Sequence, residues 1–231
     1  MELLHTTYAA LSLLMQGDAT LWGIIWVSVK VCVLALLLSA PPAILTGFLL
    51  GHFQFPGRRV LIVLVQTLLA LPTVVIGLLL YMLLSRQGPF GNMHLLFTQE
   101  AMVMGQAILA FPILAALTLS AVQGADKRAA ETAMTLGAGR LRIMWTLLVE
   151  VRFAVMAAMI SGFGRVISEI GCAMMVGGNI ANLTRNITTA IALETSKGEF
   201  VQGVALGIVL VVIALGINMG LALMQGRGAR Q

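Results

Sequence analysis

Arg165 and Glu169 stand inside an otherwise apolar stretch that runs from Phe153 to Val176. Ionisable side chains at the depth of a membrane are costly, and they usually face a bundle interior or a water-filled path. A spacing of four places both residues on one face of a helix, although arginine before glutamate is the less favourable order. Either the pair is a structural ion pair that braces neighbouring helices, or it lies beside a path through the membrane. Both interpretations stay open at this point.

Signatures of enzymatic chemistry are missing from the chain. The sequence contains no G-x-x-x-x-G-K-[ST] segment, no H-E-x-x-H, no G-x-S-x-G and no Cys/His cluster with the spacing of a metal site. Cys32 and Cys172 both lie in apolar stretches, where packing is the commoner reason for cysteine. We therefore expect no catalysis, metal or cofactor on this chain alone, and any energy from ATP must come from another subunit.

The elements that position these residues are membrane helices. Hydrophobic residues make up 59% of the chain and charged residues 10%, whereas soluble domains have about 45–50% and about 25%. A hydrocarbon core needs about 20 apolar residues in a helix. Five stretches meet this length: Leu21–Leu50, Val60–Leu84, Ala101–Val122, Phe153–Val176 and Phe200–Met224. They are too long and too evenly apolar for barrel strands, so the predicted fold is an all-α integral membrane protein with about five transmembrane helices.

One helical domain accounts for residues 1–231, because no hydrophilic stretch is long enough to bury a core of its own. The first twenty residues lack the features of a cleaved signal, so we expect them to be retained. Within them, helical spacing of apolar residues predicts a short interfacial helix; these residues are Leu3, Leu4, Tyr8, Leu11 and Met15.

The net charge of +5 is a signal of topology rather than of nucleic-acid binding. Cytoplasmic loops carry an excess of lysine and arginine. An outside amino terminus and a cytoplasmic carboxyl terminus put nine such residues inside: Arg58, Arg59, Lys127, Arg128, Arg140, Arg142, Arg152, Arg227 and Arg230. The same orientation leaves Arg86, Arg185 and Lys197 outside.

Prolines and glycines occur within the predicted spans. We expect the pair Pro41-Pro42 to split the first span, and Pro72 and Pro112 to kink the second and third. Small residues four apart allow helices to approach closely. Three such pairs occur: Gly47 with Gly51, Gly203 with Gly207, and Gly216 with Gly220.

Three connections are long enough to have structure. Two of them, 85–100 and 177–199, lie outside in this topology, and the polar second one favours a re-entrant or surface-lying helix. The third, about 124–152, lies in the cytoplasm. Its residues Asp126–Leu136 form helix readily, Gly137 ends that helix, and a second helix starts near Arg140. Such a loop is either a solvated connector or a docking element for a soluble partner.

The pattern Glu131-x-Ala133-x-x-Leu136-Gly137-Ala138 resembles the EAA-x3-G loop of ABC-importer permeases, which docks into a groove of the ATPase subunit. The run from Gly164 to Ile180 resembles the matching segment of molybdate, sulfate and tungstate permeases. The segment Thr188–Phe200 is most similar to tungstate permeases, as is Glu150-x-Arg152-Phe153, which stands where other permeases end the loop with Leu-Pro.

This resemblance implies a type I ABC-importer permease that acts as a homodimer in the inner membrane. Two ATPase subunits, which bind ATP and Mg, would lie beneath it, and an extracytoplasmic substrate-binding protein above. The implied coupling residues are Glu131, Ala133, Leu136, Gly137 and Ala138. The candidates for the pathway or gate are Arg165, Glu169, Met174, Met175, Gly177, Gly178 and Asn179, and those on the outer loop are Thr184, Arg185 and Thr188. The cargo would be tungstate, with molybdate or sulfate as the alternative. An ion channel or a scaffold that recruits a cytoplasmic partner is the alternative from another class.

Overall fold

The structure, a computed structural model, describes residues 8, 12, 15 and 17–228, and every regular element within them is a helix. The helices are α2 (Ala19–His52), α3 (Arg58–Leu69), α4 (Thr73–Leu84), the 3-10 turn η1 (Gly91–Met93), α5 (Gln99–Gly124), α6 (Lys127–Thr135), α7 (Arg140–Glu150), α8 (Arg152–Ile167), α9 (Gly171–Gly177), α10 (Ile187–Lys197) and α11 (Phe200–Gly228). Most of the predicted amino-terminal helix, including Leu3, Leu4 and Leu11, lies outside the described residues.

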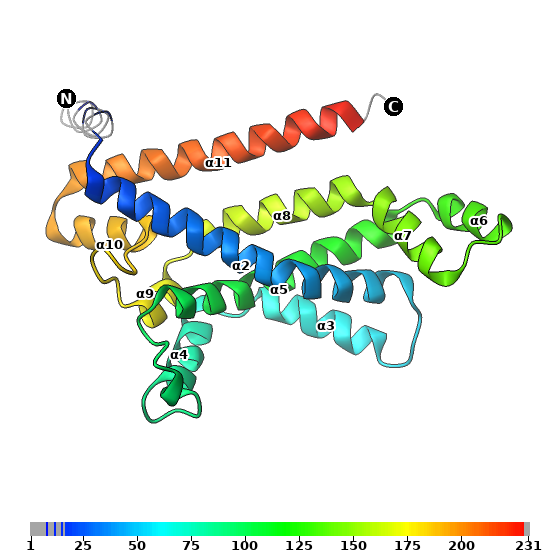
Figure 1. Cartoon of the computed structure of the whole chain (residues 1–231), viewed down its shortest axis with the longest axis horizontal. Helices are drawn as coiled ribbons and strands as arrows, with labels where there is room; N and C mark the ends of the chain where they lie inside the picture. The colour runs from blue at the N-terminus through cyan, green and yellow to red at the C-terminus, as the bar shows by residue number, and fades with distance from the viewer. Residues whose placement is uncertain (1–7, 9–11, 13–14, 16, 229–231) are drawn as a thin grey trace.

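The helices α2, α5, α8 and α11 run roughly along the longest axis of the molecule, whereas α4 runs across it (Figure 1). Among the described residues, α2, α5 and α11 are each long and apolar enough to span a bilayer alone. The number rises to five if each bent pair is one span, namely α3 with α4, bent by 96°, and α7 with α8, bent by 61°. The start of α2 and the end of α11 lie at opposite ends of the bundle (Figure 1). The predicted all-α fold is confirmed, and the count of about five spans stays a prediction that lies within this range of three to five.

Close packing of α2 against α5 forms the centre of the bundle. A β-carbon added to Gly47 would collide with the backbone oxygen of Ala115, and one added to Gly51 would lie 2.7 Å from Cβ of Val122. The predicted close approach at this glycine pair is therefore confirmed. By contrast, β-carbons at Gly207, Gly216 and Gly220 would meet nothing within 4 Å among the described residues, and one at Gly203 would lie an ordinary 3.4 Å from Oγ1 of Thr195.

The prolines behave differently from one another. Pro72 is the N-cap of α4 and stands at the 96° bend, so the predicted kink of the second span is confirmed. The pair Pro41-Pro42 does not split the first span, because α2 continues unbroken from Ala19 to His52. The flanking residues Ala40 and Ala43 are buried in one cluster with residues of α5, and this packing holds the helix together across the pair.

The two predicted connecting helices are both present. Asp126 caps α6 by accepting the amide of Arg128 at 2.9 Å, and Gly137 follows the helix with a φ of 76°. At the other end of the molecule, Asn186 caps α10 through a capping box with Thr189. The loop carrying α6 and the layer formed by α9 and α10 thus lie at opposite ends of the bundle (Figure 1).

Candidate functional site

The fourth predicted span is not one helix. It breaks after α8, with Ser168, Glu169 and Ile170 between Ile167 and the start of α9. This break lies beside the break between α3 and α4, because one small cavity of about 20 Å³ touches both. Its lining residues are Leu68, Leu69, Leu71, Thr73, Leu109, Ile113, Arg165, Val166 and Glu169. The two charged residues of the fourth span therefore stand where two broken spans meet.

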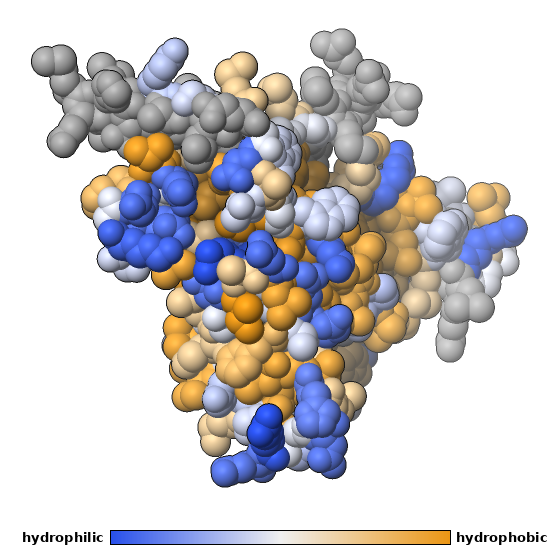
Figure 2. All heavy atoms as spheres, turned by 60° about the vertical axis from the view of Figure 1, so that its left-hand side comes forward, coloured by the Kyte–Doolittle hydropathy of each residue, from blue (hydrophilic) through white to orange (hydrophobic). Residues whose placement is uncertain are grey.

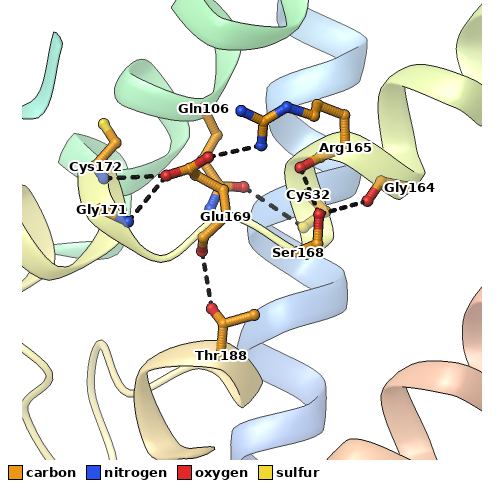
Figure 3. A network of polar contacts seen from close by, with 9 residues as sticks. All are labelled: Cys32, Gln106, Gly164, Arg165, Ser168, Glu169, Gly171, Cys172 and Thr188. Carbon is orange, nitrogen blue, oxygen red and sulfur yellow. Dashed lines mark hydrogen bonds and ion pairs between the residues drawn. The ribbon is translucent and has the colours of Figure 1, made fainter. Parts of the chain in front are cut away.

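Glu169 lies in the break itself rather than on the helix face that the spacing predicted. It is nevertheless four residues from Arg165, and Nη1 of Arg165 lies 2.8 Å from its Oε2. Its other oxygen, Oε1, accepts the backbone amides of Gly171 at 2.9 Å and Cys172 at 3.4 Å (Figure 3). The side chain is buried, with only 4% of the residue exposed. One carboxylate thus holds the arginine and caps the following helix.

Arg165 is more open than a charge in a bundle interior was expected to be. Its side chain is 49% exposed, although it sits in the last turn of an apolar helix. An exposed guanidinium at membrane depth needs water or another protein surface, since lipid tails offer it no hydrogen bond. The geometry therefore combines the two interpretations. Glu169 braces the break, and the exposed side of the Arg165 guanidinium remains open to further contacts.

The outer loop, residues 177–199, is hydrogen-bonded to the break between α8 and α9. Thr188 of α10 donates its hydroxyl to the backbone oxygen of Glu169 at 2.8 Å (Figure 3). The same hydroxyl oxygen lies 3.0 Å from Oδ1 of Asn186. Thr184 donates its hydroxyl to the backbone oxygen of Gly177 at 2.5 Å. Both threonines are buried. Their hydroxyls are paired inside the protein in this structure, and their contact with arriving cargo stays a prediction.

The candidate gate at the end of α9 divides into packed and open residues. Val176 and Gly177 are buried, and a β-carbon at Gly177 would lie 2.8 Å from Sδ of Met102. Met174 is exposed and Met175 half-buried. The backbone then turns through two left-handed residues, Gly178 with a φ of 68° and Asn179 with a φ of 50°.

Two polar atoms near this turn are buried without a hydrogen-bond partner among the described residues. They are Oδ1 of Asn179 and Nε of Arg185. Arg185 does reach back through its Nη2 to the backbone oxygen of Asn179, at 3.5 Å. These two candidates therefore sit together, whereas Thr184 and Thr188 belong to the bracing of the loop.

The candidate coupling residues lie at the far end of the bundle and are mostly open. Glu131 is exposed, and Leu136 is 82% exposed at the end of α6. Ala133 lies in α6, and Ala138 packs at the edge of a buried cluster with Phe48 and Ile143. A β-carbon at Gly137 would meet nothing within 4 Å, so only its left-handed backbone restricts this position.

Two residues with unusual contacts were not singled out in the sequence. Nζ of Lys30 on α2 donates to Oε1 of Gln99 at 2.9 Å, and Nε2 of Gln99 donates to the backbone oxygen of Leu183 at 2.7 Å. Lys30 could have been singled out from the sequence, because it is the only lysine in the first apolar stretch, Leu21–Leu50. Phe97 has a φ of 66° and donates its amide to the backbone oxygen of Val176 at 2.9 Å. No sequence pattern marks such a conformation.

Comparisons with known proteins agree with this architecture. Residues 43–225 match the family model described as binding-protein-dependent transport system inner membrane component. The chain is 40% identical over 209 residues to the tungstate uptake system permease protein TupB of Campylobacter jejuni, covering 90% of this chain and 87% of that one. It is 31% identical over 215 residues to the molybdenum transport system permease protein ModB of Escherichia coli K12, covering 87% and 93%.

Among solved structures, the chain resembles one in the crystal structure of a bacterial alginate ABC transporter in complex with a pentasaccharide-bound periplasmic protein. The TM-score is 0.75 at 18% identity, over 93% of this chain and 81% of the other. At this level of identity the likeness concerns the fold alone.

Proposed function

Because this chain belongs to the family of binding-protein-dependent transport system inner membrane components, we propose that it is the permease of an ATP-driven importer whose cargo is tungstate. The identity of 40% to a tungstate uptake permease, against 31% to a molybdenum permease, supports tungstate over molybdate. Sulfate has the same charge and tetrahedral shape and remains the third cargo to compare.

The observation that carries the anion assignment is the half-exposed guanidinium of Arg165 at the junction of two broken spans. Its charge attracts a dianion, and the buried carboxylate of Glu169, 2.8 Å away, offsets part of that charge. A carrier must release its cargo as well as bind it, so a fully unopposed cation would be a trap. The pair therefore suits transient contact with a passing oxyanion.

The proposed orientation puts α6 and α7 in the cytoplasm. The basic residues of that loop support this orientation, because cytoplasmic loops carry an excess of lysine and arginine. The exposed residues around Glu131 and Leu136 then face an ATPase subunit that binds ATP and Mg. A second copy of this chain and an extracytoplasmic binding protein complete the proposed complex.

Movement passes from the ATPases to the break through a short path. Val151 is both the C-cap of α7 and the N-cap of α8, so the docking loop is joined directly to the helix that ends at Arg165. Closure of the ATPases shifts α6 and α7 and rocks α8, and the break at Glu169 carries the shift to α9 and α10. The two copies thereby alternate between inward-open and outward-open arrangements.

The deciding experiment measures ATP hydrolysis by the complete complex with its binding protein while tungstate, molybdate and sulfate are titrated. We expect tungstate to stimulate hydrolysis at the lowest concentration. Stimulation by molybdate or sulfate at lower concentrations would change the cargo and leave the transport class intact. A complex that hydrolyses ATP but responds to none of the three anions would overturn the proposed function.

A further inference from the structure

Hydrophobic side chains form most of the body of the molecule above the hydrophilic tip of segment 85–98 (Figure 2). In such surroundings a polar group without a partner is costly, so each one calls for an explanation. The cavity where the two broken spans meet is lined by three side chains with hydrogen-bonding groups, namely Thr73, Arg165 and Glu169. These three differ in how many of their polar atoms are paired.

Both carboxylate oxygens of Glu169 are already engaged. Oε2 pairs with Nη1 of Arg165, and Oε1 accepts the amides of Gly171 and Cys172. The guanidinium of Arg165 makes no other hydrogen bond within the part of the chain that the structure describes. Its remaining N–H groups are therefore free to donate at this junction.

Thr73 is the first residue of α4 and follows Pro72 at the 96° bend. It is half-buried, and its hydroxyl has no hydrogen-bond partner among the described residues. Thr67, near the end of α3, differs in this respect, because its hydroxyl donates to the backbone oxygen of Val63 at 2.8 Å. The hydroxyl of Thr73 is thus a donor at the cavity that the described chain does not use.

Gly171 brings this hydroxyl close to the charged pair. A β-carbon at Gly171 would lie 3.0 Å from Oγ1 of Thr73 and 2.7 Å from Cγ2 of Val74, so the start of α9 packs directly against the start of α4. The amide of Gly171 is in turn held by Glu169. The unused hydroxyl and the unused guanidinium groups therefore line one cavity, and all of them are donors. A negatively charged ligand with acceptor oxygens is the chemistry that fits these donors.

We propose that Thr73 is a cargo-contacting residue, whose hydroxyl and the guanidinium of Arg165 donate to the same oxyanion during transport. The inference rests on the proposed function, which supplies the anion. The cavity holds about 20 Å³, which admits about one water molecule but not a tetrahedral oxyanion. The contact therefore forms when α4 and α8 move apart. Because Thr73 and Arg165 belong to different spans, movement of α8 opens and closes the site.

The test measures tungstate uptake by the complete permease–ATPase complex in proteoliposomes, with its purified binding protein. Thr73→Val keeps the shape of the side chain and removes the donor. We expect uptake to fall about tenfold, the loss typical of one hydrogen bond to a charged ligand. Thr73→Ser keeps the hydroxyl and should retain most of the uptake. Thr67→Val removes a hydroxyl that does not line the cavity, so it is the matched control and should transport as the wild type does.

A double-mutant cycle separates contact with the anion from packing. If Thr73 and Arg165 bind the same oxyanion, their effects are coupled. Thr73→Val should then lower uptake far less in the Arg165→Gln background than in the wild type. The thermal midpoint of Thr73→Val without anion should stay at the wild-type value, because the substitution removes no hydrogen bond of the described chain.

Wild-type uptake by an assembled Thr73→Val complex would overturn the inference. A fall in its thermal midpoint or loss of the permease dimer would do the same, because the hydroxyl would then serve packing or a second copy. Independent, additive effects of the two substitutions would exclude a shared anion. If Thr73→Val does not assemble, Thr73→Ala is judged by the same three criteria. Failure of the proposed function is distinguishable, because there the wild-type complex itself responds to no oxyanion.

Discussion

The hydroxyl of Thr188 lies 2.8 Å from the backbone oxygen of Glu169, although nineteen residues separate the two along the chain. A helix that ends inside a bundle leaves backbone carbonyls without intrahelical partners. The carbonyl of Glu169, in the break just after α8, likewise has no intrahelical partner, and Thr188 satisfies it and so connects α10 to the residue that pairs with Arg165. The outer layer and the charged pair therefore form one connected unit.

Removing this hydroxyl should loosen that unit. Thr188→Val keeps the shape of the side chain but leaves the backbone oxygen of Glu169 without this donor, at a cost of about 1–3 kcal/mol. We expect a lower midpoint in thermal unfolding of the purified complex and faster hydrogen exchange in α10. Thr188→Ser keeps the hydroxyl and is the matched control. Equal stability of the valine and wild-type proteins would contradict a bracing role.

Because one side of Arg165 is exposed, we expect its substitution to affect transport rather than stability. Arg165→Gln removes the positive charge and should reduce oxyanion uptake about tenfold or more, because the dianion loses its cation at membrane depth. Arg165→Lys should recover part of the uptake. Uptake is measured in vesicles containing complexes of confirmed composition.

Glu169→Gln separates the two roles of the pair. It keeps an acceptor for the amides of Gly171 and Cys172 but removes the partner charge of Arg165. If the charge of Glu169 prevents trapping, this variant binds oxyanion more tightly and releases it more slowly.

Normal uptake by an assembled Arg165→Gln complex would rule out a role of Arg165 in the pathway and leave only its structural role as the partner of Glu169.

Gly137 tests the coupling loop. Its φ of 76° strains any residue with a β-carbon, and the surrounding space is open, so the effect of substitution is on the backbone alone. We expect Gly137→Val to uncouple ATP hydrolysis from transport in an assembled complex. Gly137→Asn should retain more coupling, because asparagine tolerates the left-handed region.

Gly139, two residues away, is the control for this experiment. It is extended, with a φ of −66° and no atom within 4 Å of an added β-carbon, so Gly139→Ala should behave as the wild type does. The coupling role would be wrong if the valine at position 137 left the ratio of transported anion to hydrolysed ATP unchanged.

Gly47 tests the packing of α2 on α5. Gly47→Ala places a methyl group against the backbone oxygen of Ala115 and Cβ of Thr118, and overpacking of this kind costs about 1–3 kcal/mol. The thermal midpoint should fall. Gly23→Ala lies on the same helix with nothing within 4 Å, and it should be neutral or slightly stabilising because alanine favours helix. A similar midpoint for both variants would disprove the contact.

Several features followed from local sequence alone. Continuous apolar stretches predicted the helical class and the number of spans, because backbone amides in lipid must be paired within a helix. Asp126 and Gly137 predicted the ends of α6, and Pro72 predicted the bend before α4, because caps and prolines act on their own neighbours.

The position of Glu169 depended on contacts between distant segments. The spacing from Arg165 predicted their pairing, but only the folded chain takes Glu169 off the helix, where it caps α9 and meets Thr188. Tertiary packing likewise keeps α2 continuous through Pro41-Pro42, pairs the hydroxyls of Thr184 and Thr188 inside the protein, and holds Phe97 in a left-handed conformation. The sequence by itself determined which segments are helices and where charges lie along them. The tertiary structure decided which of those charges and hydroxyls are satisfied and which stay open, because their partners come from other parts of the chain.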